Sequence, residues 1–126
     1  MLCSVRRFMA ESSLSSLDDR FRPYVEYLVA WAEYLGLRPV VTETRRSWQR
    51  QNELYAQGRT APGRIVTKAK GGESPHQYGL AADVTSSFGY GSPAALQIRA
   101  IAEYMGFGLI SWDEPHVEAP SWRSWL

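Results

Sequence analysis

Three stretches of the chain carry signals of an α-helix, and in the first and the third of them apolar residues recur every three or four positions. The stretches cover residues 22–35, 48–57 and 93–105. A glycine follows each of them directly, and the last two follow a serine, Ser47 or Ser92. Glycine is common directly after the end of a helix, and a serine directly before its start can accept a backbone N–H of the first turn. We therefore predict three helices at these positions.

The first predicted helix has an apolar face. Tyr24, Leu28, Trp31 and Leu35 are spaced four, three and four apart, so they share one side of the helix. We expect this face to lie in the core. The third helix has a similar face made of Ile98, Ile101, Ala102 and Met105.

Short apolar or β-branched runs lie between the helices and predict strands. They cover residues 38–42, 80–84, 108–111 and 116–118. Helices interleaved with short strands indicate an α+β domain with a small, mainly antiparallel sheet. At 126 residues we expect a single domain, 1–126.

Three segments lie outside this pattern. Residues 1–13 are expected to form a flexible lead-in. Residues 58–73 form a long polar loop, and loops of that length in a small domain are usually functional or mobile. In the tail, residues 119–126, Trp122 and Trp125 either fold back on the domain or bind a sugar or a partner, and the burial gained by tryptophan favours folding back.

The composition argues against several classes of protein. Fourteen basic and 13 acidic residues give a net charge of +1, which does not favour nucleic-acid binding. Cys3 is the only cysteine, so an internal disulfide is excluded. No stretch is long and apolar enough to span a membrane, and residues 1–10 do not resemble a signal peptide.

The chain has two histidines, His76 and His116, each next to acids and turn-forming residues. His76 precedes Asp83 by seven residues, and Asp113 precedes His116 by three. Two imidazoles and one carboxylate would leave one zinc position open, as in catalytic sites. Asp113 would then serve as general base. From spacing alone, a metal site and two structural histidines are equally supported, and Asp113 could instead cap a turn.

Three ordered motifs resemble the M15 zinc peptidases, which include D-alanyl-D-alanine carboxypeptidases and L-alanyl-D-glutamate endopeptidases such as phage endolysins. The motifs are Ser74-x-His76-x-x-Gly79-x-Ala81-x-Asp83, Asp113-x-Pro115-His116-x-Glu118, and the segment from Arg46 to Thr60 that is typical of the endolysin-like branch. The resemblance implies a Hedgehog/DD-peptidase-like fold.

The resemblance also implies roles for single residues. His76, Asp83 and His116 would bind one Zn²⁺, and Asp113 would be the general base. Arg46 would bind a substrate carboxylate or stabilise the oxyanion. Its alternative is an ion pair with Glu43 or Glu53. Ser74 would orient the His76 loop or touch the substrate, and Glu118 would support a zinc-bound histidine. Tyr78 would line the substrate groove or pack internally, and Gln51 is expected to bond within the domain.

The implied activity is zinc-dependent hydrolysis of an amide bond in the stem peptide of bacterial peptidoglycan. L-alanyl-D-glutamate endopeptidase activity is favoured, and D-alanyl-D-alanine carboxypeptidase activity or a non-catalytic wall-binding or virion module is the alternative. A monomeric phage or prophage lysin would be made in the bacterial cytoplasm without a signal peptide. It would reach the cell wall with holin assistance or inside a virion. Many relatives carry a Gly-Gly-Asp-Trp hairpin before Asp113, and this chain does not, which predicts a short cleft wall there.

Overall fold

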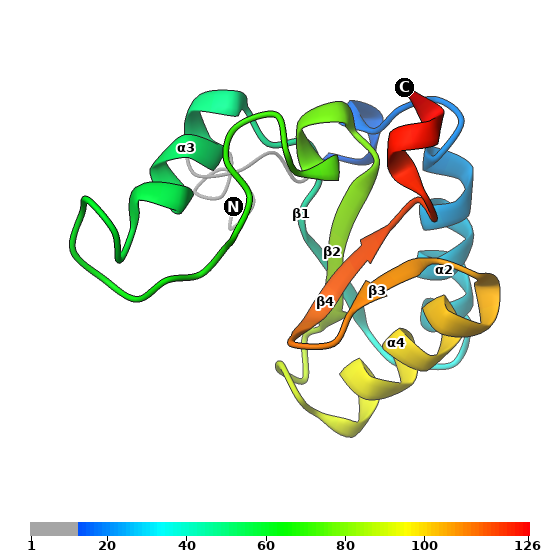
Figure 1. Cartoon of the computed structure of the whole chain (residues 1–126). Coiled ribbons are helices and arrows are strands. Elements are labelled where there is room, and N and C mark those ends of the chain that lie inside the picture. The colour runs from blue at the N-terminus through cyan, green and yellow to red at the C-terminus, as the bar shows by residue number, and fades with distance from the viewer. Residues whose placement is uncertain (1–12) are drawn as a thin grey trace.

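The computed structural model describes residues 13–126 (Figure 1). Cys3 and most of the expected lead-in lie outside the described residues. The elements in chain order are η1 (Leu14–Ser16), α2 (Arg22–Tyr34), β1 (Pro39–Glu43), α3 (Trp48–Ala56), η2 (Pro75–Tyr78), β2 (Ala81–Ser86), α4 (Pro93–Met105), β3 (Gly108–Ile110), β4 (Asp113–Glu118) and η3 (Trp122–Trp125).

The four strands form one antiparallel sheet in the order β1-β2-β4-β3. Helices α2 and α4 contact each other and the strands on one side of this sheet (Figure 1). The predicted α+β fold with three α-helices is confirmed. Strand β4 is longer than predicted and begins at Asp113, because the chain pairs with β3 immediately after the turn.

The core between the sheet and the two helices is apolar, and it corrects the predicted face of α2. Val25, Leu28 and Ala32 are buried in this helix, whereas Tyr24 and Leu35 are about half exposed. The buried stripe is thus rotated by about one residue from the predicted one. The helix packs through small and aliphatic side chains, which lets it approach α4 closely and leaves the aromatic rings at the rim.

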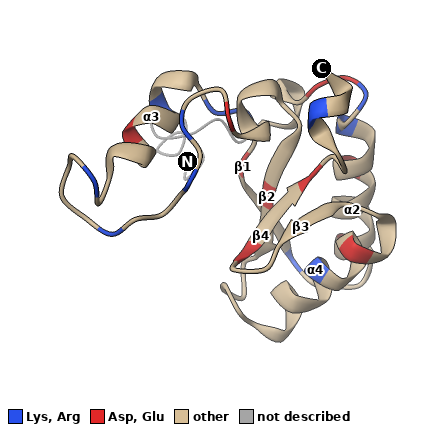
Figure 2. Ribbon diagram, in the orientation of Figure 1, with Lys and Arg blue, Asp and Glu red and all other residues tan. Residues whose placement is uncertain are grey.

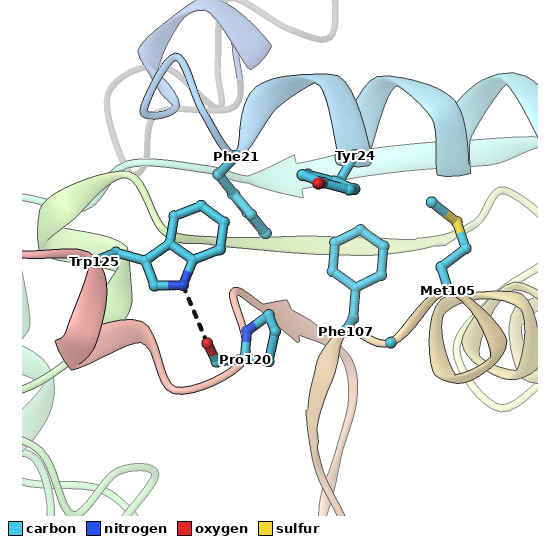
Figure 3. A pocket seen from close by; sticks show the side chains of 7 residues that line it. Phe21, Tyr24, Met105, Phe107, Pro120 and Trp125 are labelled. Carbon is cyan, nitrogen blue, oxygen red and sulfur yellow. Dashed lines mark hydrogen bonds between the residues drawn. The ribbon is translucent and has the colours of Figure 1, made fainter.

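The C-terminal tail folds back on the domain. Trp122 is buried and stacks on Tyr78, with ring centroids 5.6 Å apart. Trp125 meets Phe21 edge-on and donates its indole N–H to the carbonyl of Pro120 at 3.2 Å (Figure 3). Residues 119–126 therefore complete the core beside η2 and α2.

Helix α3 and the loop that follows it project away from the sheet (Figure 1). We call residues 48–73 the α3 lobe. Gln51 is its only buried residue. In the described part of the chain, none of the helices has the length and apolar character needed to cross a membrane.

Candidate metal centre

The sheet places Asp83 and His116 next to each other on the face away from the helices. Ala82 and Val84 on β2, and Val117 on β4, point into the core. Since side chains alternate along a strand, Asp83 and His116 point to the opposite face. The two are directly opposite each other in the antiparallel register, so their side chains meet.

His76 reaches the same point from the turn η2. Ser74 caps this turn, because its hydroxyl accepts the backbone N–H of His76 and the side chain of Gln77 bonds back to the backbone of Ser74. Gly79 ends the turn with φ of +70°. A Cβ there would lie 2.6 Å from Arg45 and 2.7 Å from the backbone nitrogen of Asp18, so only glycine fits.

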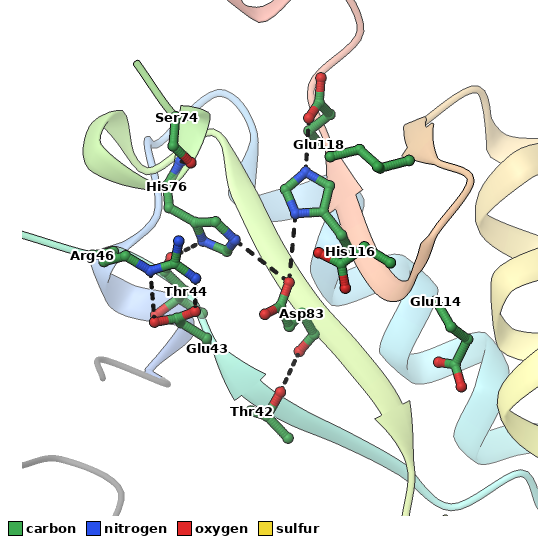
Figure 4. Close-up of polar contacts among 12 residues, drawn as sticks. Thr42, Glu43, Thr44, Arg46, Ser74, His76, Asp83, Glu114, His116 and Glu118 are labelled. Carbon is green, nitrogen blue, oxygen red and sulfur yellow. Dashed lines mark hydrogen bonds and ion pairs between the residues drawn. The ribbon is translucent and has the colours of Figure 1, made fainter. Parts of the chain in front are cut away.

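Hydrogen bonds fix which nitrogen of each ring faces the centre (Figure 4). Nδ1 of His76 lies 2.6 Å from the carbonyl of Thr44, which can only accept, so this nitrogen carries the proton. In the same way, Nε2 of His116 donates to Glu118 at 2.7 Å. When the rings are neutral, as a bound metal requires, their lone pairs therefore lie on Nε2 of His76 and Nδ1 of His116.

These two nitrogens converge on one oxygen of Asp83. Its Oδ1 atom lies 3.4 Å from Nε2 of His76 and 3.6 Å from Nδ1 of His116 (Figure 4). Within residues 13–126 this buried oxygen has no hydrogen-bond partner. Three lone-pair atoms within 4.8 Å of one another form a donor set suited to a metal ion. The nitrogen and oxygen donors fit zinc, with Thr44 and Glu118 orienting the rings.

Asp83 and His116 each stabilise the charged form of the other. Burial disfavours the ionised form of Asp83, but contacts with His116 and His76 outweigh it and hold its pKa far below the usual range. Burial likewise favours neutral His116, but Asp83 and Glu118 raise its pKa to about 9. A positive charge is therefore strongly favoured at this point.

Asp113 lies beside the centre at the start of β4. Its carboxylate lines the same cleft as His76 and His116, and it has no ion-pair partner within residues 13–126. Burial raises the pKa of Asp113, and the negative charge of Asp83 adds to the effect. A raised pKa suits a carboxylate that must accept and return a proton.

Arg99 holds the segment that carries Asp113, a role the sequence analysis missed. From α4 its guanidinium donates to the carbonyls of Ile110, Asp113 and Glu114 at 3.0, 3.2 and 3.1 Å. The Glu114 carboxylate accepts the backbone N–H of Gly91 at 2.7 Å. A cation next to the buried Ile98 in a largely apolar helix was the one available signal.

Arg46 lines the cleft, but its guanidinium forms an ion pair with Glu43 (Figure 4). Nε of Arg46 lies 2.9 Å from one Glu43 oxygen, its Nη2 bonds to the other, and Nη1 donates to Gln51 at 2.7 Å. Both members of the pair are nearly buried. The charge of Arg46 is thus matched inside the protein.

Gln51 connects three parts of the site. Its Oε1 accepts from Arg46 and, at 3.2 Å, from Gln77 of η2. Its Nε2 donates to the carbonyl of Ala69 in the loop at 2.7 Å. Gln51 therefore bonds within the domain.

The remaining candidates are placed as follows. Ser74 and Glu118 line a cleft of about 600 Å³ together with His76, His116, Asp113 and Arg46. Tyr78 is not among the lining residues. Its ring stacks on Trp122, and its hydroxyl donates to the carbonyl of Gly72 at 2.8 Å. The structure therefore brings together every candidate except Tyr78, which packs behind the cleft, and Gln51, which lies beneath Arg46.

Residues 14–107 match the family described as VanY, D-alanyl-D-alanine carboxypeptidase. The chain belongs to this family. The match includes Arg46, His76 and Asp83 and ends before Asp113 and His116. The chain is also 49% identical over 69 residues to the peptidoglycan L-alanyl-D-glutamate endopeptidase CwlK of Bacillus subtilis (strain 168). That alignment covers 55% of this chain and 41% of the relative, so less than half of the relative's length is matched.

Solved structures share the fold. The LdcB LD-carboxypeptidase superposes with a TM-score of 0.64 at 18% identity, covering 82% of this chain and 58% of that one. A variant of the vancomycin-resistance D,D-pentapeptidase VanY in complex with Zn(II) gives 0.62 at 21% identity, covering 82% and 72%. VanYB in complex with D-alanine-D-alanine gives 0.60 at 20% identity, covering 86% and 74%.

Proposed function

We propose that this protein is a zinc-dependent peptidase that hydrolyses an amide bond in the stem peptide of peptidoglycan. The observation that carries the proposal is the buried Oδ1 atom of Asp83, on which two correctly oriented histidine nitrogens converge. The family match supports peptidase activity, and the VanY structure that contains Zn(II) supports the choice of metal.

His76, Asp83 and His116 would hold the metal. A zinc ion in this position would act as a Lewis acid on the scissile carbonyl and acidify a water molecule. The residues around the site then handle the proton. The Asp113 carboxylate accepts it from the attacking water as the carbon–oxygen bond forms, and returns it to the amine nitrogen as the carbon–nitrogen bond breaks.

For the scissile bond we propose L-alanyl-D-glutamate, with D-alanyl-D-alanine as the alternative. Identity to CwlK supports the first, and the description of the family supports the second. Use as a phage or prophage endolysin belongs to the same proposal, and it rests on the resemblance of residues 46–60 to the endolysin-like branch.

The test uses zinc-loaded protein and purified peptidoglycan. We expect new amino groups, and mass spectrometry of the fragments should show N-terminal D-glutamate. The Asp113→Asn variant should keep its zinc and lose activity by about 10²–10⁴-fold, because only proton transfer is removed. The His116→Ala variant should lose both. If wild-type protein releases no amino groups, or if Asp113→Asn remains fully active, the proposed function is wrong.

A further inference from the structure

The walls of the cleft carry a cation that the internal contacts of the protein do not neutralise. Arg46 is paired with Glu43. Lys68 lines the cleft from the loop of the α3 lobe, is exposed, and within residues 13–126 has no carboxylate within ion-pair distance. Figure 2 shows that basic residues recur along this loop. Lys68 is the loop lysine that faces the cleft.

The backbone on both sides of Lys68 is held in place. The carbonyl of Thr67 accepts from Arg59 at 3.0 Å, and the hydroxyl of Thr67 accepts the N–H of Ala69 at 3.1 Å. The carbonyl of Ala69 accepts from Gln51 at 2.7 Å. The Gln51 bond attaches the segment to α3 and the Arg59 bond attaches it to the turn after α3, so the backbone position of Lys68 is defined although its side chain is solvent-accessible.

The side chain of Lys68 contacts the opposite wall of the cleft. Its Nζ lies over the ring of Trp112, 5.6 Å from the centroid. Trp112 stands in the turn before Asp113, and its side chain is 74% exposed. A cation–π contact orients the ammonium group without neutralising it, so its N–H groups remain available to an anion. The pair bridges the loop and the β3–β4 turn.

We propose that Lys68, held over Trp112, binds a free carboxylate of the substrate peptide. The inference rests on the proposed function and adds a specificity-determining residue to it. D-glutamate has two carboxyl groups, and the stem peptide continues through only one of them. The other is one source of the anion, and the carboxylate at the end of a D-alanyl-D-alanine substrate is the second. A lysine over an aromatic ring recognises the group common to both.

Two pairs of synthetic stem peptides separate the sources. One pair differs by a free or amidated carboxyl on D-glutamate, and the other by a free or amidated C-terminus. In zinc-loaded protein, Lys68→Met should raise KM about 10-fold for the peptide that carries the recognised carboxylate, with kcat within about twofold. For its amidated partner, wild type and variant should have equal KM. Lys68→Arg should restore most of the difference.

Lys70→Met is the matched control. Lys70 lies two residues along the same loop, and its ammonium group lies over Tyr55 rather than in the cleft, 5.5 Å from the ring centroid. We expect it to leave KM unchanged for all four peptides. A purely structural role of Lys68 in the loop would instead change KM equally for the acid and amide forms, and that result would overturn the proposal.

Binding measurements make the result independent of turnover. Calorimetry with zinc-loaded Asp113→Asn protein should show that one acid peptide binds more tightly than its amide, and that adding Lys68→Met removes the difference. Equal affinity for acid and amide, or no binding of any peptide, refutes the role of Lys68. Binding with the expected difference but no cleavage by wild type would refute the proposed function and leave the carboxylate site standing.

Discussion

The two halves of this molecule are held together by different forces. The sheet half, with β1 to β4, α2 and α4, surrounds a core of aliphatic and aromatic side chains such as Leu28 and Ile98. In the α3 lobe only Gln51 is buried, and hydrogen bonds hold the loop to the helix. The sheet half and η2 supply the candidate metal ligands, and the lobe supplies a cleft wall. Hydrophobic packing therefore positions the candidate metal ligands, and hydrogen bonds position the cleft wall next to them.

Removal of zinc should act on the sheet half and have the largest effect. The three ligands join β2, β4 and η2, so a bound ion cross-links these elements. At a zinc concentration a thousandfold above Kd, binding contributes about 4 kcal/mol to stability. We expect chelation to abolish hydrolysis and to lower Tm in thermal unfolding, while hydrogen exchange in residues 48–73 changes little. Faster exchange throughout the lobe would show that the halves are coupled.

The pH dependence of the chelated protein follows from His116. Its folded-state pKa of about 9 exceeds its ordinary value of 6.5, so the protonated imidazole stabilises the fold fully below pH 6.5, and this contribution is lost as pH rises to 9. The loss amounts to at most about 3 kcal/mol. Urea unfolding of chelated protein should show it, whereas zinc-loaded protein should not weaken, because zinc needs the deprotonated ring. A flat profile for chelated protein would contradict this.

Gln51→Leu should have the next largest effect, and it acts on the lobe. The change leaves N–H groups of Arg46 and Gln77 and the carbonyl of Ala69 without their partner. Each such group costs about 1–3 kcal/mol where water cannot replace the bond. We expect a loss of about 3 kcal/mol in urea unfolding and faster hydrogen exchange in the loop.

Asn52→Ala is the control for Gln51. The exposed Asn52 accepts one bond, from the N–H of Gly71 at 2.8 Å, and water can replace it. Its loss should therefore cost less than about 1 kcal/mol. Equal stability of Gln51→Leu and wild type would mean that other contacts hold the lobe.

Two matched cap variants give the smallest effect and the sharpest comparison. Ser47 caps α3 and Ser92 caps α4, and each hydroxyl accepts a backbone N–H three residues later, at 2.9 and 3.2 Å. Replacement by alanine costs about 1 kcal/mol, and replacement by glycine a few tenths. We expect Ser92→Ala to lower the free energy of global unfolding, and Ser47→Ala to accelerate exchange chiefly within α3. Equal global effects would show that the halves unfold together.

Local sequence signals predicted most of the fold. The starts of α3 and α4 agree with the serine caps, and β2 overlaps the strand predicted over residues 80–84. The apolar face of α2 was wrong by about one residue, since aromatic and aliphatic positions both follow the helical period. Only packing against α4 decides which of them is buried.

Short-range interactions decided the elements and the order of the candidate ligands, because caps, turns and alternation involve residues a few positions apart. The same patterns indicated a candidate site made of His76, Asp83, Asp113 and His116. The tertiary structure alone decided the partners. Glu43 forms an ion pair with Arg46, and Arg99 donates a hydrogen bond to the carbonyl of Asp113. Lys68 forms a cation–π contact with Trp112. Which of several possible partners a side chain meets is set by how helices and strands pack in space, a choice that spacing along the chain does not contain.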